Sequence, residues 1–236
     1  MLQLSPKRIA IVQSNYIPWK GYFDLIRAVD EFVFLDDAQF TKRDWRNRNK
    51  ILTANGPMWL SIPVVTKGKY QQSIDETEIA EPWAERHWSS IQYNYAKAAH
   101  FGEMAAVVKE LYDRAALEAK LSRVNYLMIS GICSIIGIKT KLSWSRDYPV
   151  QGFKTDRLLS ICVASGATHY LSGPAAASYL EIVRFTAAGM TVSYADYSSY
   201  PVYPQLHEPF KHDVSILDLL FNTGSAASTF MKNVDP

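Results

Sequence analysis

Residues 8–37 read RIAIVQSNYIPWKGYFDLIRAVDEFVFLDD, and this stretch decides the fold. Residues 8–13 are an apolar run of strand length, and residues 32–35 are a second run that is wholly apolar. Between them, Pro18 suits the first position of a helix that we expect to reach about Val29. A strand, a helix and a buried strand in this order are typical of a parallel βαβ unit with both faces covered.

The same alternation continues towards the C-terminus. Further strands are expected at 59–65, 141–145, 169–172 and 191–195, and further helices at 82–97, 103–120, 122–137, 156–165, 174–186 and from Asp213 or Ser215 to Leu220. We expect Thr155 to cap the helix at 156–165. The alternation predicts an α/β fold with an open, mostly parallel, Rossmann-like sheet. We expect a single α/β domain over residues 1–236, in which the helical block at about 82–137 can form an insertion or cap.

Composition excludes several classes of protein. Of the 236 residues, 48% are hydrophobic and 20% are charged, which allows a large core and excludes a disordered chain. The net charge of +2 excludes a polycation. No apolar run reaches the roughly 20 residues that span a bilayer, and residues 1–8 do not resemble a signal peptide. Cys133 and Cys162 lack metal-ligand spacing, so we expect two buried, reduced thiols, a cytoplasmic protein and no zinc.

A basic segment follows the second strand. Residues 42–50 read KRDWRNRNK and hold five cations and one acid around a tryptophan. A solvated loop is the ordinary explanation of such a cluster. Here the cations are mostly Arg, which binds phosphate or carboxylate with two parallel hydrogen bonds, and they alternate with Asn. Because ligand loops of α/β proteins follow strands, we predict that this segment binds substrate. The predicted residues are Lys42, Arg43, Trp45, Arg46, Asn47 and Arg48.

The loop after the first strand offers a second set of polar groups. Its only glycine is Gly21, so it has neither the GxGxxG pattern of a dinucleotide site nor a P-loop. Anions nevertheless favour the start of a helix that follows a strand, and an ordinary turn with aromatic packing is the alternative. The residues predicted to bind substrate in this loop are Gln13, Asn15, Tyr16, Trp19 and Tyr22.

Two acids, Asp36 and Asp37, end the second strand. On a continuing strand they point to opposite faces, so one can bind a ribose hydroxyl, an amine or Mg²⁺ while the other anchors the basic segment. A pair that only terminates the strand is the alternative. We predict that Asp36 binds substrate and that Asp37 acts as a catalytic base.

Two helix starts add anion-binding candidates. Lys154 and Arg157 surround the start of a helix, where cations are unfavourable unless an anion is nearby. Solvated charges are the alternative. Ser172 and Gly173 form a turn between a strand and a helix, which is a geometry that suits anions. We predict that all four residues contact substrate.

The aromatic and proline-rich stretch 197–210 resembles the loops that cover pockets or form interaction surfaces. Within it, Tyr203 and Gln205 are predicted to bind substrate. His207 is the predicted acid or base, and His212 is a second candidate, although a lone histidine is more often an ordinary surface residue. No HExxH or GxSxG motif is present, so neither a zinc enzyme nor a serine hydrolase is indicated.

Four runs of sequence, 11–26, 36–49, 170–173 and 213–222, resemble the WbqC-like protein family. The resemblance covers nearly the whole chain, with one local departure at Ser14, where the family pattern has proline. It implies a product of bacterial O-antigen and surface-polysaccharide gene sets. This association suggests work on nucleotide-activated sugars in lipopolysaccharide biosynthesis, with a small-molecule sugar nucleotide as partner and no assigned oligomeric state.

The opening residues also resemble nucleotidyltransferase-like folds such as pantothenate synthetase. Trp19 and Tyr22 stand where a pair of histidines holds the ATP phosphates in that family, so its ATP site does not carry over. The resemblance therefore leaves the cofactor open between ATP and an acyl donor. The sequence has no NAD or zinc signature.

Three functions follow from these residues. The first is a transferase or ligase that adds an acyl or aminoacyl group to a nucleotide-linked amino sugar, with Asp37 or His207 as base. The second is a non-enzymatic binding or scaffolding protein of polysaccharide assembly. A cavity that combines Gln13, Asp37 and Arg46 would favour the enzyme, and a flat aromatic surface would favour the scaffold. The near-neutral charge argues against the third function, nucleic-acid binding.

Overall fold

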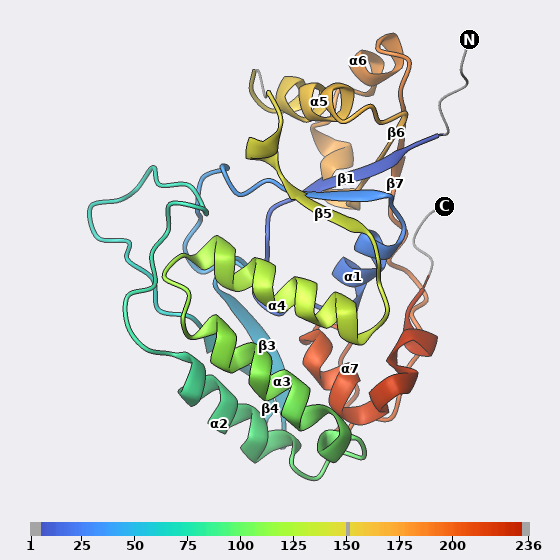
Figure 1. Ribbon diagram of the computed structural model, residues 1–236. Coiled ribbons are helices and arrows are strands. Elements are labelled where there is room, and N and C mark those ends of the chain that lie inside the picture. The colour runs from blue at the N-terminus through green and yellow to red at the C-terminus, as the bar shows by residue number, and fades with distance from the viewer. Residues whose placement is uncertain (1–5, 150–151, 233–236) are drawn as a thin grey trace.

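The computed structural model describes residues 6–149 and 152–232 and contains a five-stranded parallel sheet (Figure 1). The strands are β1 (Arg8–Val12), β2 (Glu31–Phe34), β5 (Lys141–Trp144), β6 (His169–Ser172) and β7 (Thr191–Tyr194). They pair in the order β5-β2-β1-β6-β7, and every pair is parallel. The predicted Rossmann-like α/β sheet is therefore confirmed. The strand order reverses between β1 and β6, and open sheets of this type bind ligands at such a reversal.

Both faces of the sheet are buried. Residues of β1 and β2 alternate between two apolar clusters, as the pleat of a strand requires. The cluster on one face contains Ile9, Ile11 and Val33 with side chains of α5 (Thr155–Ala164) and α6 (Ile182–Ala187). The cluster on the other face contains Ala10, Phe32 and Phe34 with side chains of α1 (Lys20–Arg27). All four residues of β2 are buried, as the predicted βαβ unit requires.

The second cluster continues into a hairpin and four helices. These elements are β3 (Arg48–Thr53), β4 (Gly56–Ser61), α2 (Ala84–Tyr95), α3 (Phe101–Ala115), α4 (Leu121–Ile135) and α7 (Ile216–Thr223). β3 and β4 pair only with each other, as a separate antiparallel sheet within the described residues. Figure 1 shows α2, α3 and α4 side by side, next to the hairpin and α7 and away from α5 and α6. The three helices expected at 82–137 are thus present.

The hairpin corrects the expected course of the basic segment. The segment is not a loop throughout, because β3 begins within it at Arg48. The strand expected at 59–65 is β4, which begins at Gly56 and ends at Ser61. Gly56 has a φ of 96°, a conformation that glycine adopts readily at a hairpin turn. The polar start of β3 lacks the β-branched and apolar residues that mark a strand in a sequence.

Three helix assignments can be compared with the structure. Ser215 caps α7, since its hydroxyl oxygen accepts a hydrogen bond from a main-chain amide two residues later at 3.2 Å. The expected cap by Thr155 is wrong, because Lys154 occupies the cap position and Thr155 is the first residue of α5. The helix expected at 174–186 is divided into a 3-10 helix, η2 (Pro174–Ser178), and α6.

Two further observations concern the membrane and the cysteines. Among residues 6–149 and 152–232, no helix is long and apolar enough to cross a membrane. Cys133 and Cys162 are free and buried, and burial raises the pKa of each thiol to about 12. Thiols in such surroundings stay protonated and are poor nucleophiles.

Candidate functional site

The loop that follows β1 is anchored to its neighbours at the carboxyl edge of the sheet. The amide of Ser14 donates to the Asp36 carboxylate at 2.8 Å, and the Ser122 hydroxyl donates to the same carboxylate. Burial raises the pKa of Asp36. The carbonyl of Gln13 accepts a hydrogen bond from the Tyr22 hydroxyl at 3.0 Å. Asp36 and Tyr22, both predicted to bind substrate, therefore fix this loop.

Arg46 holds the same loop from the side of the basic segment. Its guanidinium donates to the side-chain oxygen of Asn15 and to the carbonyls of the two preceding residues, at 3.3 and 3.4 Å. The side chain of Arg46 is only 12% exposed. Asn125 of α4 donates to the Arg46 carbonyl and to the Ser14 hydroxyl, both at 2.9 Å. Arg46 is thus engaged in shaping the loop.

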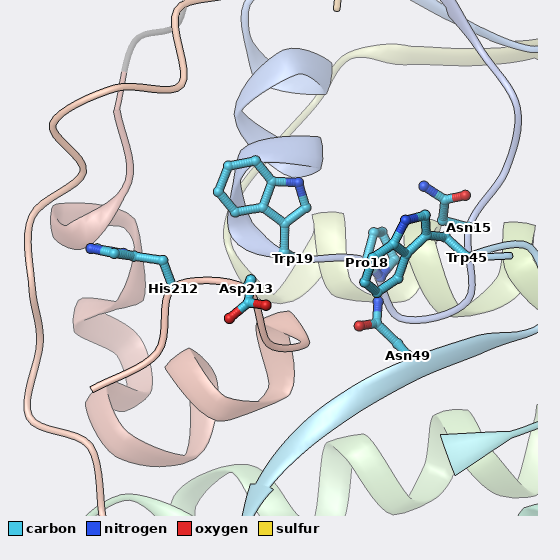
Figure 2. A pocket seen from close by; sticks show the side chains of 7 residues that line it. All are labelled: Asn15, Pro18, Trp19, Trp45, Asn49, His212 and Asp213. Carbon is cyan, nitrogen blue, oxygen red and sulfur yellow. The ribbon is translucent and has the colours of Figure 1, made fainter. Parts of the chain in front are cut away.

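A cavity of about 300 Å³ opens beside this loop (Figure 2). Its lining residues are Asn15, Pro18, Trp19, Trp45, Asn49, His212 and Asp213. They come from the β1–α1 loop, the basic segment, β3 and the stretch that precedes α7. Largely apolar walls with a few polar groups are the usual form of a small-molecule site.

Two tryptophans form the aromatic walls. Trp19 precedes α1 and packs edge-on against Tyr197, with ring centroids 5.2 Å apart. Because Tyr197 follows β7, Trp19 connects the cavity with the carboxyl ends of the sheet. A Cβ at Gly21 would lie 2.3 Å from the Trp19 ring, so the ring requires glycine there. Trp45 packs against Trp59 of β4, with ring centroids 5.3 Å apart.

The two asparagines of the cavity differ in the partners they already have. Asn49 donates its amide hydrogens to the carbonyls of Tyr16 and Ile17, at 3.1 and 2.9 Å, and so supports the loop. Asn15 gives its oxygen to Arg46. Its amide nitrogen has no partner among the described residues, and Figure 2 shows this nitrogen turned to the side opposite the oxygen, towards the cavity. Asn15 therefore offers a hydrogen-bond donor to a ligand.

His212 and Asp213 are the titratable groups of the cavity. Asp213 pairs with Lys50 of β3, and this ammonium group lowers the pKa of Asp213. Burial lowers the pKa of His212, and the positive charge of Lys20 lowers it further. The Nδ1 atom of His212 has no hydrogen-bond partner among the described residues. Both effects favour the uncharged imidazole, which is the form that a general base requires, although the Asp213 carboxylate opposes them.

The cavity contains three of the residues predicted to bind substrate, Asn15, Trp19 and Trp45. Lys42 and Arg43 are exposed on the outer part of the basic segment. Asn49, Pro18 and Asp213 were not among the predicted binding residues. The alternation of Asn with cations in the basic segment extends to Asn49, and this pattern is the signal that could have found it. For Pro18 and Asp213, the sequence indicates a helix start and nothing more. Neither residue begins its helix, because α1 begins at Lys20 and α7 at Ile216.

Several other predicted binding residues are bonded inside the protein. The Tyr16 hydroxyl bonds to a histidine of α2 and a tyrosine of α3, both at 2.8 Å. The side chain of Asn47 donates to a carbonyl just beyond β4 at 2.8 Å. Tyr203 and Gln205 both donate to the Asp218 carboxylate at 2.8 Å. These contacts stabilise the fold around the cavity.

The two residues predicted to be catalytic lie in different surroundings. Asp37 follows β2, pairs with Arg157 of α5 and accepts a hydrogen bond from the Ser145 hydroxyl at 2.7 Å. The Nε2 atom of His207 lies 3.1 Å from the carbonyl of Asn94 in α2. Neither residue lines the cavity. The structure joins Gln13 to Arg46 but does not add Asp37 to them, so the combination of these three residues that would favour an enzyme does not occur.

The remaining predicted residues also stand outside the cavity. Ser172 is buried at the end of β6, and its hydroxyl lies 3.3 Å from that of Tyr170. Gly173 follows at the carboxyl end of the strand, and Lys154 is exposed at the start of α5. Any contact of these residues with substrate would need a ligand that reaches beyond the cavity along the sheet edge.

Comparison with known proteins connects this arrangement with one family. The profile of the WbqC-like protein family matches residues 13–230. The chain belongs to this family. It is also 47% identical over 227 residues to "Uncharacterized protein Rv1507c" of Mycobacterium tuberculosis, across 96% of this chain and 98% of that protein. No solved structure matches. In this WbqC-like chain, every residue that lines the cavity lies within the matched segment.

Proposed function

We propose that this WbqC-like protein is a transferase or ligase that modifies a nucleotide-activated amino sugar by acyl or aminoacyl transfer. The proposed setting is bacterial O-antigen or surface-polysaccharide biosynthesis in the cytoplasm, with which the family resemblance is associated. One observation carries the proposal. A cavity with tryptophan walls, a free amide donor and a histidine lies next to the carboxyl edge of a Rossmann-like sheet.

The lining residues fit a sugar ring. Indole rings pack against the C–H faces of a sugar, and Trp19 and Trp45 supply two of them. The amide nitrogen of Asn15 can donate to a sugar oxygen, because its own oxygen is held by Arg46. The carboxylate of Asp213 can accept from an amine or a hydroxyl.

The proposed reaction needs a base beside the sugar amine. The amine nitrogen attacks the acyl carbon of the donor, a C–N bond forms, and the bond between the acyl carbon and its carrier breaks. His212 takes the proton that the amine loses, and the carrier departs with the electron pair of the broken bond. We place this role at His212 because it lines the cavity and burial lowers its pKa. Asp37 and His207 stay alternative predictions for the same role.

A thermal-shift screen tests for the substrate. The probes are UDP-, dTDP- and GDP-linked amino sugars, the free nucleotides and acyl-CoAs. A ligand that binds only the folded state raises the melting temperature by mass action. We expect at least one amino-sugar nucleotide to do so. If none of the sugar nucleotides shifts the melting temperature, the proposal is wrong.

A product assay then tests the base. The stabilising amino-sugar nucleotide is incubated with acyl donors, and the new amide is measured by mass spectrometry. Loss of a general base lowers the rate by about 100-fold or more. We expect this loss in His212→Asn and not in the matched variants Asp37→Asn and His207→Asn. A normal rate in His212→Asn, with a loss in either matched variant, would move the base to that residue.

Three exposed apolar side chains favour the alternative, a non-enzymatic binding or scaffolding protein. Val163, Tyr179 and Val183 are exposed on and near α5 and α6, away from the cavity. Exposed apolar side chains of this kind occur at interaction sites. The alternative predicts that Val183→Asp disrupts polysaccharide assembly in cells while His212→Asn does not. The enzyme proposal predicts the reverse.

A further inference from the structure

The cavity is small for a complete sugar nucleotide. Its volume of about 300 Å³ lies at the lower end of the range of ligand sites. A sugar nucleotide has a sugar ring at one end and a nucleoside at the other, joined by a charged diphosphate. If the sugar occupies the cavity, the nucleoside and the diphosphate must contact the surface outside it.

A surface of suitable chemistry adjoins the cavity. We define the Trp45–Trp59 surface as Trp45, Arg48, Lys50 and Trp59, all of them on the basic segment or on the hairpin that it begins. The residues Trp45 and Trp59 are 39% and 43% exposed, although tryptophan is usually largely buried. Because Trp45 also lines the cavity, this surface is continuous with it.

Arg48 lies on this surface without a direct ion pair, although its positive charge helps to lower the pKa of the nearby Asp44 carboxyl. Its guanidinium carbon is 4.2 Å from the centre of the Trp59 ring. The guanidinium donates to the carbonyl of Arg43, while its Nε atom is buried and has no partner among the described residues. No described carboxylate forms an ion pair with it. A cation in this state can bind an anion without breaking an existing ion pair.

Lys50 stands between the surface and the cavity. Its ammonium nitrogen is 5.7 Å from the ring centres of both Trp45 and Trp59, and it pairs with Asp213 in the cavity wall. The side chain of Asp213 is 65% exposed and that of Lys50 is 16% exposed, and solvent at the carboxylate weakens the ion pair. A diphosphate, which carries more charge than a carboxylate, can therefore replace Asp213 as the partner of Lys50.

We propose that the Trp45–Trp59 surface binds the nucleoside diphosphate part of the substrate. Arg48 and Lys50 contact the diphosphate, the base packs against the exposed indole of Trp59, and the sugar enters the cavity past Trp45. This assignment rests on the proposed function, and it adds Trp59 and Lys50 as binding residues. Diphosphate binding also frees the carboxylate of Asp213 for the sugar.

Isothermal titration of the full chain with UDP, dTDP, GDP and inorganic pyrophosphate tests the assignment. We expect at least one nucleoside diphosphate to bind the wild type. Trp59→Ala removes one stacked ring, so it should lower the affinity for this nucleotide by about fivefold or more and leave the affinity for pyrophosphate unchanged. Arg48→Gln should lower the affinity for the nucleotide and for pyrophosphate. Tyr179→Ala, which removes an exposed ring near α6, is the matched control and should weaken neither.

The outcomes separate this assignment from the proposed function. If sugar nucleotides stabilise the wild type, the proposed function is retained. The assignment is then overturned if no nucleoside diphosphate binds, or if one binds Trp59→Ala and Arg48→Gln as tightly as the wild type. If neither sugar nucleotides nor nucleoside diphosphates bind, both are overturned. Because Trp59 is partly exposed and Arg48 lies at the start of β3, we expect both variants to fold. Urea unfolding of each variant verifies this.

Discussion

The cavity and the buried carboxylate clusters beside it differ in whether their polar side chains already have hydrogen-bond partners. Asp218 on α7 accepts hydrogen bonds from Tyr95, Tyr203 and Gln205, all at 2.8 Å. In the cavity, by contrast, the amide nitrogen of Asn15 has no partner among the described residues, because only its side-chain oxygen is bonded, to Arg46. The Nδ1 atom of His212, in the cavity wall, is buried and also has no partner in this part of the chain. Polar groups that are fully paired hold a fold together, whereas unpaired groups in a concavity are available to a ligand.

A second buried cluster shows the same pattern. Asp24 on α1 accepts from the Tyr200 hydroxyl at 2.7 Å and from the Arg27 guanidinium at 2.8 Å. Burial raises the pKa of Asp24 as it raises that of Asp218. Two of the tyrosines in the stretch 197–210, Tyr200 and Tyr203, thus bond to buried acids. From this difference we infer that the tyrosines bonded to buried acids stabilise the fold, and that the exposed tryptophans at the cavity bind the ligand.

The largest expected effect is on the buried side of this comparison. Asp218→Ala leaves the buried hydroxyls of Tyr95 and Tyr203 without an acceptor, whereas Gln205 keeps the carbonyl of Lys211, and each unpaired hydroxyl costs about 1–3 kcal/mol. We therefore expect the free energy of unfolding to fall by about 4 kcal/mol, measured by urea denaturation. A loss below about 1 kcal/mol would mean that the cluster is not a structural unit.

A pH titration tests a third paired group, His87 of α2. Burial lowers the pKa of His87 from 6.5 to about 4, and its Nδ1 atom accepts from the Tyr16 hydroxyl. As the pH falls below 6.5, the unfolded chain binds the proton first, so the stabilisation is complete above pH 6.5 and is lost towards pH 4. The loss should reach about 3 kcal/mol.

Urea denaturation between these two pH values measures the effect. His87→Gln, which cannot titrate, is the matched control and should show a shallower dependence of stability on pH. The same slope in wild type and variant would show that other groups cause the acid destabilisation.

The smallest expected effect on stability belongs to the cavity. Asn15→Asp keeps an oxygen that can accept from Arg46 but replaces the free donor by a second acceptor. We expect the free energy of unfolding to change by less than about 1 kcal/mol. The affinity for a stabilising sugar nucleotide should fall by about tenfold, since a buried acceptor loses its partner. If Asn15→Asp binds as tightly as wild type but is strongly destabilised, Asn15 is structural.

Much of the fold can be predicted from the sequence because its signals are local. The apolar runs of β1 and β2 and the helix between them are sufficient to indicate a parallel sheet. The start of β3 could not be predicted in this way. Arg48, Asn49 and Lys50 are polar, and they form a strand because β4 pairs with them at a distance in sequence.

The candidate site was less accessible to sequence reasoning. Asn15, Trp19 and Trp45 could be selected by residue type and by their place after strands. The burial of each side chain could not be predicted in this way. Tyr16 was therefore predicted to bind substrate as Asn15 was, although its hydroxyl is hydrogen-bonded in the core. Asp213 joins the cavity only because α7 packs against β3, which is a tertiary contact without a local pattern.

The central claim is that the cavity with its tryptophan walls is the ligand site, and tryptophan resonances test it directly. The chain has six tryptophans, so six indole N–H signals can be assigned in a ¹H–¹⁵N spectrum. Trp19 and Trp45 line the cavity and Trp59 adjoins it, whereas Trp83, Trp88 and Trp144 pack elsewhere. On titration with a stabilising sugar nucleotide, the first three signals should shift and the other three should not. Shifts confined to Trp83, Trp88 or Trp144 would contradict the account.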